Sequence, residues 1–252
     1  ILHVALDGRP MGCTKLTPHG GSPVAYIVDI AVLDRSTLAA VDTAAREVRV
    51  VRCIGSDKGE EKPALGFSDP KTAPRSPTAV TVEGDEVFVA DSETRDIRVY
   101  GTDGRFLRAI AGDLRPVLGF VNSLLMADGR LVVSDSSGGR VIAIDPANGR
   151  LVKTFGLSGN RFRGMVADKW GRIYVADPPK QAIEVFDSDG NHLRVLDFSS
   201  IAGTSSASAA AGAPSAPQDI VWVKRGSRIY VADTGPGALR VYNVRPVTKG
   251  RL

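Results

Sequence analysis

The chain has 252 residues, of which 43% are hydrophobic and 24% are charged, a composition typical of a soluble globular protein with a sizeable core. No run of about 18 apolar residues occurs, which excludes a membrane-spanning helix. The formal net charge is +4, and because the basic residues are spread along the chain, charge alone does not favour a nucleic-acid-binding surface.

A short apolar strand that ends in aspartate recurs five times. A period of roughly 45 residues is typical of a propeller blade and too long for most helical solenoids. In chain order these strands end at Asp42, Asp91, Asp135, Asp177 and Asp233.

Each aspartate-ending strand is predicted to be the second strand of a four-stranded unit. Alternating strands precede it, starting in chain order at Asp29, Thr78, Asn122, Gly164 and Asp219. Third strands follow it, centred on Arg49, Arg98, Ile142, Glu184 and Arg240. Glycine-containing turns then lead into fourth strands at 106–112, 151–156 and 192–198. Such a unit cannot bury both of its faces alone, so the pattern predicts an all-β fold, a β-propeller of four-stranded blades.

Five blades are counted, and a sixth upstream of Ile1 is left open. The fifth repeat supplies three strands through residues 239–244, and residues 1–7 resemble the fourth strand at 192–198. We therefore expect the N-terminal strand to pair with the last blade and close the propeller, which would hide the open sheet edges. Residues 64–67 are a candidate fourth strand for the first blade.

Residues 1–252 are predicted to form one propeller domain with two long inter-blade loops. The segment 56–76 is polar and proline-rich, and the segment 199–217 is of low complexity. Both compositions are typical of loops rather than of strands.

Two stretches resemble the NHL repeat, which forms β-propellers. They are AVTVEGDEVFVADSETRDIRVYGTDG at 79–104 and GMVADKWGRIYVADPPKQAIEVFDSDG at 164–190. The resemblance implies the fold, but it does not select a function, because such propellers serve as scaffolds, RNA readers, lyases and lactonases.

The polar residues fall into two groups. The five repeated aspartates stand before turns, where a carboxylate accepts backbone N–H bonds, and we interpret them as structural. The residues that begin the first strands are expected to surround one mouth of the central channel. The candidate ligand-binding residues are therefore Asp29, Thr78, Asn122 and Asp219.

Two enzyme families that share the propeller scaffold were compared with the sequence. The gluconolactonase and regucalcin family holds a divalent cation with acidic and amide side chains, whereas the matching positions here carry no carboxylate: Val28, Pro77, Val121, Arg163 and Gln218. The peptide-amidating lyases bind zinc through histidines, and the three histidines of this chain are not expected to converge: His3, His19 and His192. The sequence therefore implies no catalytic residue, metal or cofactor.

Cys13 and Cys53 are not spaced as metal ligands. They are either bridged or two buried thiols, and a disulfide would favour an extracytoplasmic, secreted location.

The sequence favours a non-enzymatic scaffold that presents loop surfaces to a protein partner, as a subunit of a larger complex. An RNA-binding NHL module is the first alternative, although most aromatic residues fall at core positions rather than beside arginines. A metal-dependent hydrolase or lyase with a site at the channel mouth is the second.

Overall fold

The computed structural model describes residues 2–4, 10–13, 26–34, 36–52, 60–62, 69–110, 118–155, 161–197, 216–223, 228–235 and 237–243. Apart from the 3₁₀ helix η2 (Pro178–Lys180), the regular structure in these residues consists of β-strands. None of the described helices is long and apolar enough to cross a membrane. The chain is thus all-β, as predicted.

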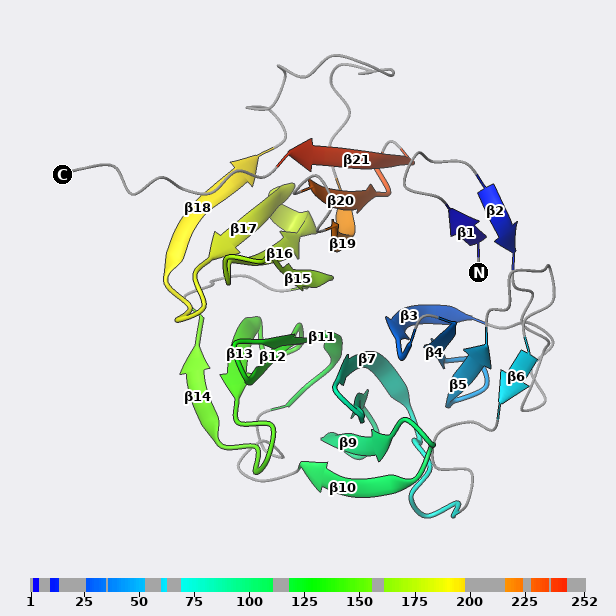
Figure 1. Cartoon of the computed structure of the whole chain (residues 1–252). Coiled ribbons are helices and arrows are strands. Elements are labelled where there is room, and N and C mark those ends of the chain that lie inside the picture. The colour runs from blue at the N-terminus through cyan, green and yellow to red at the C-terminus, as the bar shows by residue number, and fades with distance from the viewer. Residues whose placement is uncertain are drawn as a thin grey trace. The chain divides into compact units, whose positions relative to one another are not determined.

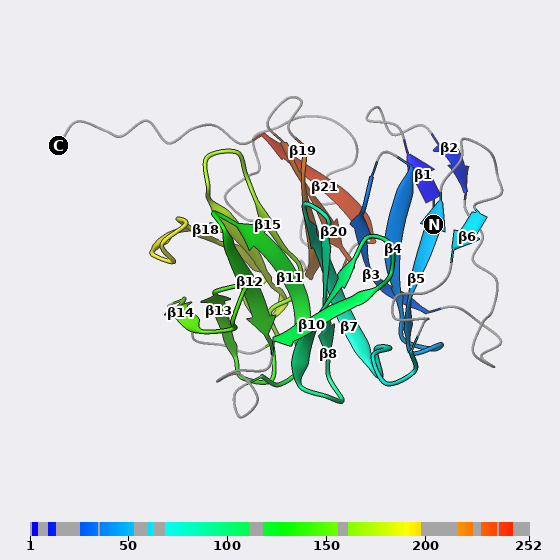
Figure 2. The same ribbon diagram turned by 60° about the horizontal axis from the view of Figure 1, so that its bottom comes forward.

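Five antiparallel sheets follow the strand order of propeller blades (Figures 1 and 2). The first blade contains β3 (Ile27–Val32), β4 (Thr37–Asp42), β5 (Glu47–Arg52) and β6 (Glu60–Lys62). The second contains β7 (Pro77–Glu83), β8 (Glu86–Asp91), β9 (Asp96–Gly101) and β10 (Phe106–Ile110). The third contains β11 (Val121–Ala127), β12 (Arg130–Asp135), β13 (Arg140–Ile144) and β14 (Leu151–Thr154). The fourth contains β15 (Met165–Ala167), β16 (Ile173–Asp177), β17 (Ala182–Phe186) and β18 (His192–Asp197). The fifth has three strands, β19 (Pro217–Val223), β20 (Arg228–Asp233) and β21 (Ala238–Asn243). The β-propeller class and the count of five blades are confirmed for the described residues.

Two sequence-based expectations about strands were wrong. β1 (Leu2–Val4) pairs with β2 (Pro10–Cys13) in a separate two-stranded sheet, rather than adding a fourth strand to the last blade. The fourth strand of the first blade is β6, inside the segment 56–76 that was predicted to be a loop. The candidate at 64–67 lies outside the described residues, as does 199–215 of the other predicted loop.

The chain divides into two compact units, residues 1–124 with 147–149, and residues 125–146 with 150–252. Whether they form one domain stays a prediction.

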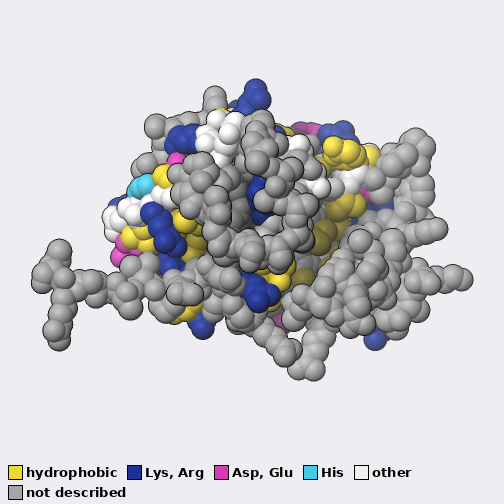
Figure 3. All heavy atoms as spheres, turned by 90° about the horizontal axis from the view of Figure 1, so that it is seen from above, with side chains coloured by type: hydrophobic (Ala, Val, Ile, Leu, Met, Phe, Trp, Pro, Cys, Tyr) yellow, Lys and Arg dark blue, Asp and Glu magenta, His cyan; other side chains and the backbone are white. Residues whose placement is uncertain are grey.

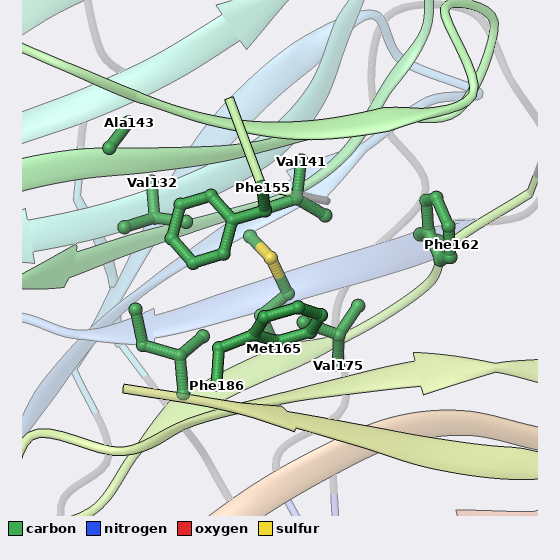
Figure 4. Close-up of a cluster of buried hydrophobic side chains, with 9 residues drawn as sticks. Val132, Val141, Ala143, Phe155, Phe162, Met165, Val175 and Phe186 are labelled. Carbon is green, nitrogen blue, oxygen red and sulfur yellow. The ribbon is translucent and has the colours of Figure 1, made fainter. Parts of the chain in front are cut away.

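The core of each unit lies between consecutive blades. In the first unit, Val80 of β7 belongs to one buried cluster with residues of β4 and β5: Ala39, Val41, Val48 and Val50. In the second unit, Met165 of β15 meets residues of β12 and β13 in the same way, and Phe155 and Phe186 pack edge to face (Figure 4). Ile220 of β19 lies in a cluster with residues of β16 and β17: Tyr174, Ala176, Ile183 and Val185. The first strand of a blade is therefore covered by the second and third strands of the preceding blade.

Repeated aspartates accept backbone N–H bonds from the turns between second and third strands, as predicted, at Asp42, Asp91, Asp135 and Asp177. Asp91 is representative, because its Oδ1 accepts the N–H groups of Glu93 at 3.0 Å and Thr94 at 3.1 Å. Each of these turns ends in a left-handed residue, in chain order Arg46, Arg95, Gly139, Gln181 and Gly237. The bonds to aspartate help to stabilise that conformation where the residue is not glycine.

Candidate interaction surface

The predicted ligand-binding residues do not occupy one equivalent column. Asp29 pairs with Val41, and Asp219 pairs with Ala232, which are matching ladder positions. In β7 that position is taken by Ala79, which pairs with Ala90, and Thr78 lies one residue earlier, at a register shift that all three strands share. Asn122 is half-buried in β11. That these four side chains surround a channel mouth, or bind a ligand, stays a prediction.

Asp29 links the first two blades. Its Oδ2 accepts the backbone N–H of Val80 in β7 at 2.9 Å, and its Oδ1 accepts the N–H of Ile30 at 2.9 Å. A side chain that bonds to a neighbouring sheet in this way has a structural role, whatever else it does.

Asp219 lies against the first strand of the fourth blade. The N–H of Gly164 donates to the carbonyl of Gln218 at 2.9 Å, and a Cβ on residue 164 would lie 2.0 Å from Asp219 Oδ1. The surrounding protein raises the pKa of the Asp219 carboxyl group through burial, despite the bond from Ile220 N–H, although the side chain keeps contact with solvent. Glycine at position 164 is thus required by close packing.

The recurring arginines of the third strands pair with the turn aspartates. The N–O distances are 3.2 Å for Arg49 and Asp42, 3.9 Å for Arg98 and Asp91, and 2.6 Å for Arg240 and Asp233. These arginines therefore form ion pairs with the turn aspartates of their own blades.

The third and fourth blades depart from this pairing, because Ile142 and Glu184 stand where the other three blades have arginine. Lys180 Nζ lies 3.3 Å from Asp177 Oδ2 and 2.9 Å from Glu184 Oε1, so one cation serves two buried carboxylates. His192 Nε2 is 2.7 Å from Glu184 Oε2.

Among the described residues, no group of three or more His, Cys, Asp or Glu side chains is arranged to hold a metal ion. His19 and Cys53 lie outside the described residues, and the side chains of His3 and Cys13 are not described. The disulfide therefore stays a prediction.

An aromatic cluster that the sequence analysis missed joins the fourth and fifth blades. The Trp170 ring lies edge-on to that of Trp222, with centroids 5.8 Å apart. Lys169 Nζ is 4.6 Å and Arg172 Cζ is 4.8 Å from the centroid of the Trp170 ring. The sequence feature that could have indicated this cluster is Lys169 beside Trp170, in the turn between two strands.

The clearest exposed apolar surface is formed by Val28, Ile30 and Val32 of β3 together with Tyr26, which directly precedes the strand. Ile30 is 48% exposed and Val32 is 70% exposed. The residues that match Ile30 in the ladders of the second and fifth blades are Val80 and Ile220, which are only 3% and 5% exposed. Figure 3, a view of one face of the molecule, shows further hydrophobic side chains on the described surface. We call the four-residue face of β3 the open first-strand face.

A second open surface lies on the fifth blade. Val241 of β21 is 45% exposed and Tyr230 of β20 is half-buried. Their ladder equivalents in the fourth blade, Val185 and Tyr174, are fully buried. Tyr230 is therefore less buried than Tyr174, although the two tyrosines occupy the same position in their blades.

Comparison with known proteins supports the fold and nothing finer. No protein-family model matches the chain, and no curated protein matches it significantly. A solved structure of the computationally designed Ika8 protein matches 95% of this chain, with a TM-score of 0.58 and 16% sequence identity. This chain spans 63% of the length of that protein. The computationally designed Ika4 protein matches 68% of this chain and 92% of its own, with a TM-score of 0.49 and 16% identity.

Proposed function

We propose that this chain is a non-enzymatic scaffold, built from NHL-like blades, that binds a protein partner through the open first-strand face. The observation that carries the proposal is the 48% exposure of Ile30 at a position whose equivalents, Val80 and Ile220, are buried, with Val32 also exposed on the same strand. Contiguous exposed apolar side chains are characteristic of protein-binding surfaces.

The use of the charged groups supports binding over catalysis. The turn aspartates accept backbone N–H bonds or pair with arginines, as Asp42 does with Ala44 N–H and Arg49. Bonds from backbone N–H groups and from Arg49 lower the pKa of the Asp42 carboxyl group, so this group is poorly suited to exchange protons with a substrate.

RNA binding is the second candidate, favoured by the Trp170 and Trp222 rings beside Lys169. Base stacking on aromatic rings near cations is the usual basis of single-strand recognition. It is less favoured because the arginines that recur along the third strands are paired with aspartates.

The test is affinity purification of the tagged protein from its own cells, with quantitative mass spectrometry and measurement of bound nucleic acid. The variant Val32→Lys places a charge on the open first-strand face. Leu151→Lys is the matched control, because Leu151 is also an exposed apolar strand residue, at 47% exposure, on β14.

We expect a stoichiometric, nuclease-resistant set of proteins with the wild type and with Leu151→Lys. Recovery with Val32→Lys should fall about tenfold, which corresponds to about 1.4 kcal/mol of binding free energy. Equal recovery with both variants would contradict the proposal. Nuclease-sensitive recovery of RNA, reduced by Trp170→Ala, would favour the second candidate instead.

A further inference from the structure

The sheet of the fifth blade has one strand fewer than the sheets of the other four blades. In each of those a fourth strand pairs with the third, and these fourth strands are β6, β10, β14 and β18. In the part of the chain that the structure describes, β21 pairs with β20 along one edge and with no strand along its second edge. The backbone N–H and C=O groups of such an edge are a template for a further strand.

Each fourth strand places a basic residue at the same ladder position. In chain order the basic residues are Lys62, Arg108, Lys153 and Arg194, and they pair with Val50, Val99, Ala143 and Val185 of the third strands. The equivalent third-strand residue of the fifth blade is Val241, since Tyr230 pairs with Val241 as Tyr174 pairs with Val185. A strand added to β21 in the same register therefore brings a basic residue opposite Val241.

The choice between arginine and lysine follows the second strand of the blade. The second-strand residue in the same row is aromatic in two blades, Phe88 and Tyr174, and there the basic residue is arginine. It is Ala39 or Val132 in two others, where the basic residue is lysine. The fifth blade has Tyr230 in this row, so a strand added to it is expected to carry arginine.

The contacts of the two arginines give the physical reason. Arg108 Cζ lies 6.0 Å from the centroid of the Phe88 ring. Burial raises the pKa of Tyr174, and the nearby charge of Arg194 opposes that rise. Arg108 also pairs with Glu86, at a position where the fourth blade has no acidic residue, so the aromatic ring is what the two blades share. Arginine suits this position better than lysine because its guanidinium group is more weakly hydrated and stacks on aromatic faces.

A large apolar residue follows the basic residue two positions later in the second, third and fourth blades. These residues are Ile110, Phe155 and Leu196. Ile110 and Phe155 are buried, and Leu196 packs against the cluster that contains Ile220. Leu196 pairs with Ile183, whose equivalent in β21 is Leu239. The added strand is therefore expected to place a large apolar residue opposite Leu239.

We propose that the second edge of β21 binds an extended segment of the partner protein, which adds a fourth strand to the fifth blade and carries arginine opposite Val241 and a large apolar residue two positions later. Backbone hydrogen bonds to the edge give such a strand its affinity, and side chains at alternate positions give its specificity. The inference rests on the proposed function for the protein partner and names a second contact with it.

The experiment appends a strand of known sequence to the full chain. A copy of residues 192–197, which form β18, is fused behind Leu252 through a flexible Gly/Ser linker. Hydrogen exchange then measures the protection of those backbone amides of β21 that do not bond to β20. We expect their exchange to slow about tenfold, since a short flexible linker gives an effective concentration in the millimolar range.

The matched controls change the appended copy only. Arg194→Glu in the copy should abolish the protection, because it reverses the charge beside Tyr230, and Arg194→Lys should weaken it. The chain's own β18 is unchanged, so folding of the full chain is preserved. If the intact copy gives no protection, or if either variant protects as well as the intact copy, the inference is overturned.

Affinity purification with the same fusions tests whether the partner uses this edge. The intact copy competes with the partner's strand, so recovery of the partner should fall about tenfold and should return with the Arg194→Glu copy. Unchanged recovery with a fusion that protects β21 would overturn the inference. If Val32→Lys still lowers recovery in that case, the proposed function stands and only the edge inference is wrong.

Two further outcomes overturn the inference by naming another occupant. Slow exchange of the same β21 amides in the unfused chain, independent of concentration, would mean that this chain covers the edge itself. Slow exchange that appears with a doubling of mass in light scattering would identify a second copy.

Discussion

β3 and β19 begin their blades with similar residues and differ in what covers them. Ile30 and Ile220 follow an aspartate at the same ladder position, yet Ile220 is 5% exposed and Ile30 is 48% exposed. The difference lies in the preceding sheet, which for β19 is formed by β16 and β17. Burial in a blade is therefore decided by the neighbouring blade and not by the strand itself.

The same contrast occurs between β16 and β20, which share the sequence Ile-Tyr-Val-Ala-Asp. Tyr174 is fully buried and donates its hydroxyl proton to Asp168 Oδ2 at 3.0 Å, whereas Tyr230 is half-buried. The same strand sequence is therefore buried to different extents in the two blades.

The largest effect is expected from truncating the two tyrosines. Tyr174→Ala should lower the free energy of unfolding by about 3–5 kcal/mol, as for other large buried aromatics. Tyr230→Ala should cost only about 1–2 kcal/mol, because part of its ring is already in contact with water. Chemical denaturation followed by circular dichroism measures both. Equal losses would mean that the fifth blade is covered as completely as the fourth.

The isoleucine pair tests the comparison with identical side chains. Ile220→Ala should cost about 2–5 kcal/mol, because it leaves a cavity between β19 and the fourth blade. Ile30→Ala should change stability by no more than about 0.5 kcal/mol, as expected at an exposed site. The denaturant midpoints of the two variants, measured under the same conditions, give the two losses of stability. A cost at Ile30 that approaches that at Ile220 would show that the β3 face is buried in solution.

A smaller effect is expected at Gly164, where the closed interface is tightest. Gly164→Ala places a Cβ 2.0 Å from Asp219 Oδ1 and 2.7 Å from its Cα. Overpacking of this kind costs about 1–3 kcal/mol. Adding Asp219→Gly should restore only part of the loss, because the contact with the Cα remains. Thermal unfolding of the single and double variants measures this, and full stability of Gly164→Ala would contradict the close approach of the two strands.

Features that depend on local sequence were predictable. The aspartate-ending strands and the glycine turns were identified because the bonds that define them join residues close in sequence. Gly104, Gly149 and Gly190 have positive φ, as expected for the tight turns before fourth strands. The structural role of the turn aspartates followed from the same local chemistry.

Features that depend on a distant partner were not predictable. Thr78 lies outside the expected column because the hairpins differ in length: Ala79 and Ala90 are 11 positions apart, whereas Asp29 and Val41 are 12 positions apart. A fixed offset from the repeated aspartate does not reveal this difference. β6 is Glu-Glu-Lys, which carries no apolar signal at all. The exposure of Ile30 could not be anticipated, since an apolar residue in an alternating strand is normally assigned to the core.

The smallest effect concerns the pH dependence of stability at Asp219. Burial raises the pKa of this carboxyl group above its ordinary value of 3.8, so the folded chain binds the proton more tightly than the unfolded chain. Its stabilising contribution is fully present below pH 3.8 and is lost as the pH rises through the raised pKa. Asp219→Asn cannot titrate, so we expect its stability relative to wild type to increase across this window, measured as Tm at a series of pH values.

For Asp42, in the first blade, we expect the pH dependence of stability to have the opposite sign. Although burial opposes ionisation, bonds from the N–H groups of Tyr26 and Ala45 and the charge of Arg49 lower the pKa of Asp42 below 3.8. Its contribution is therefore present above that pH and is lost as the pH falls through the lowered pKa. Asp42→Asn should be less stable than wild type at neutral pH, with a deficit that shrinks in acid. Parallel pH profiles for the two variants would contradict the assignment, because they would mean that Asp219 is as well solvated or as well bonded in the folded chain as Asp42.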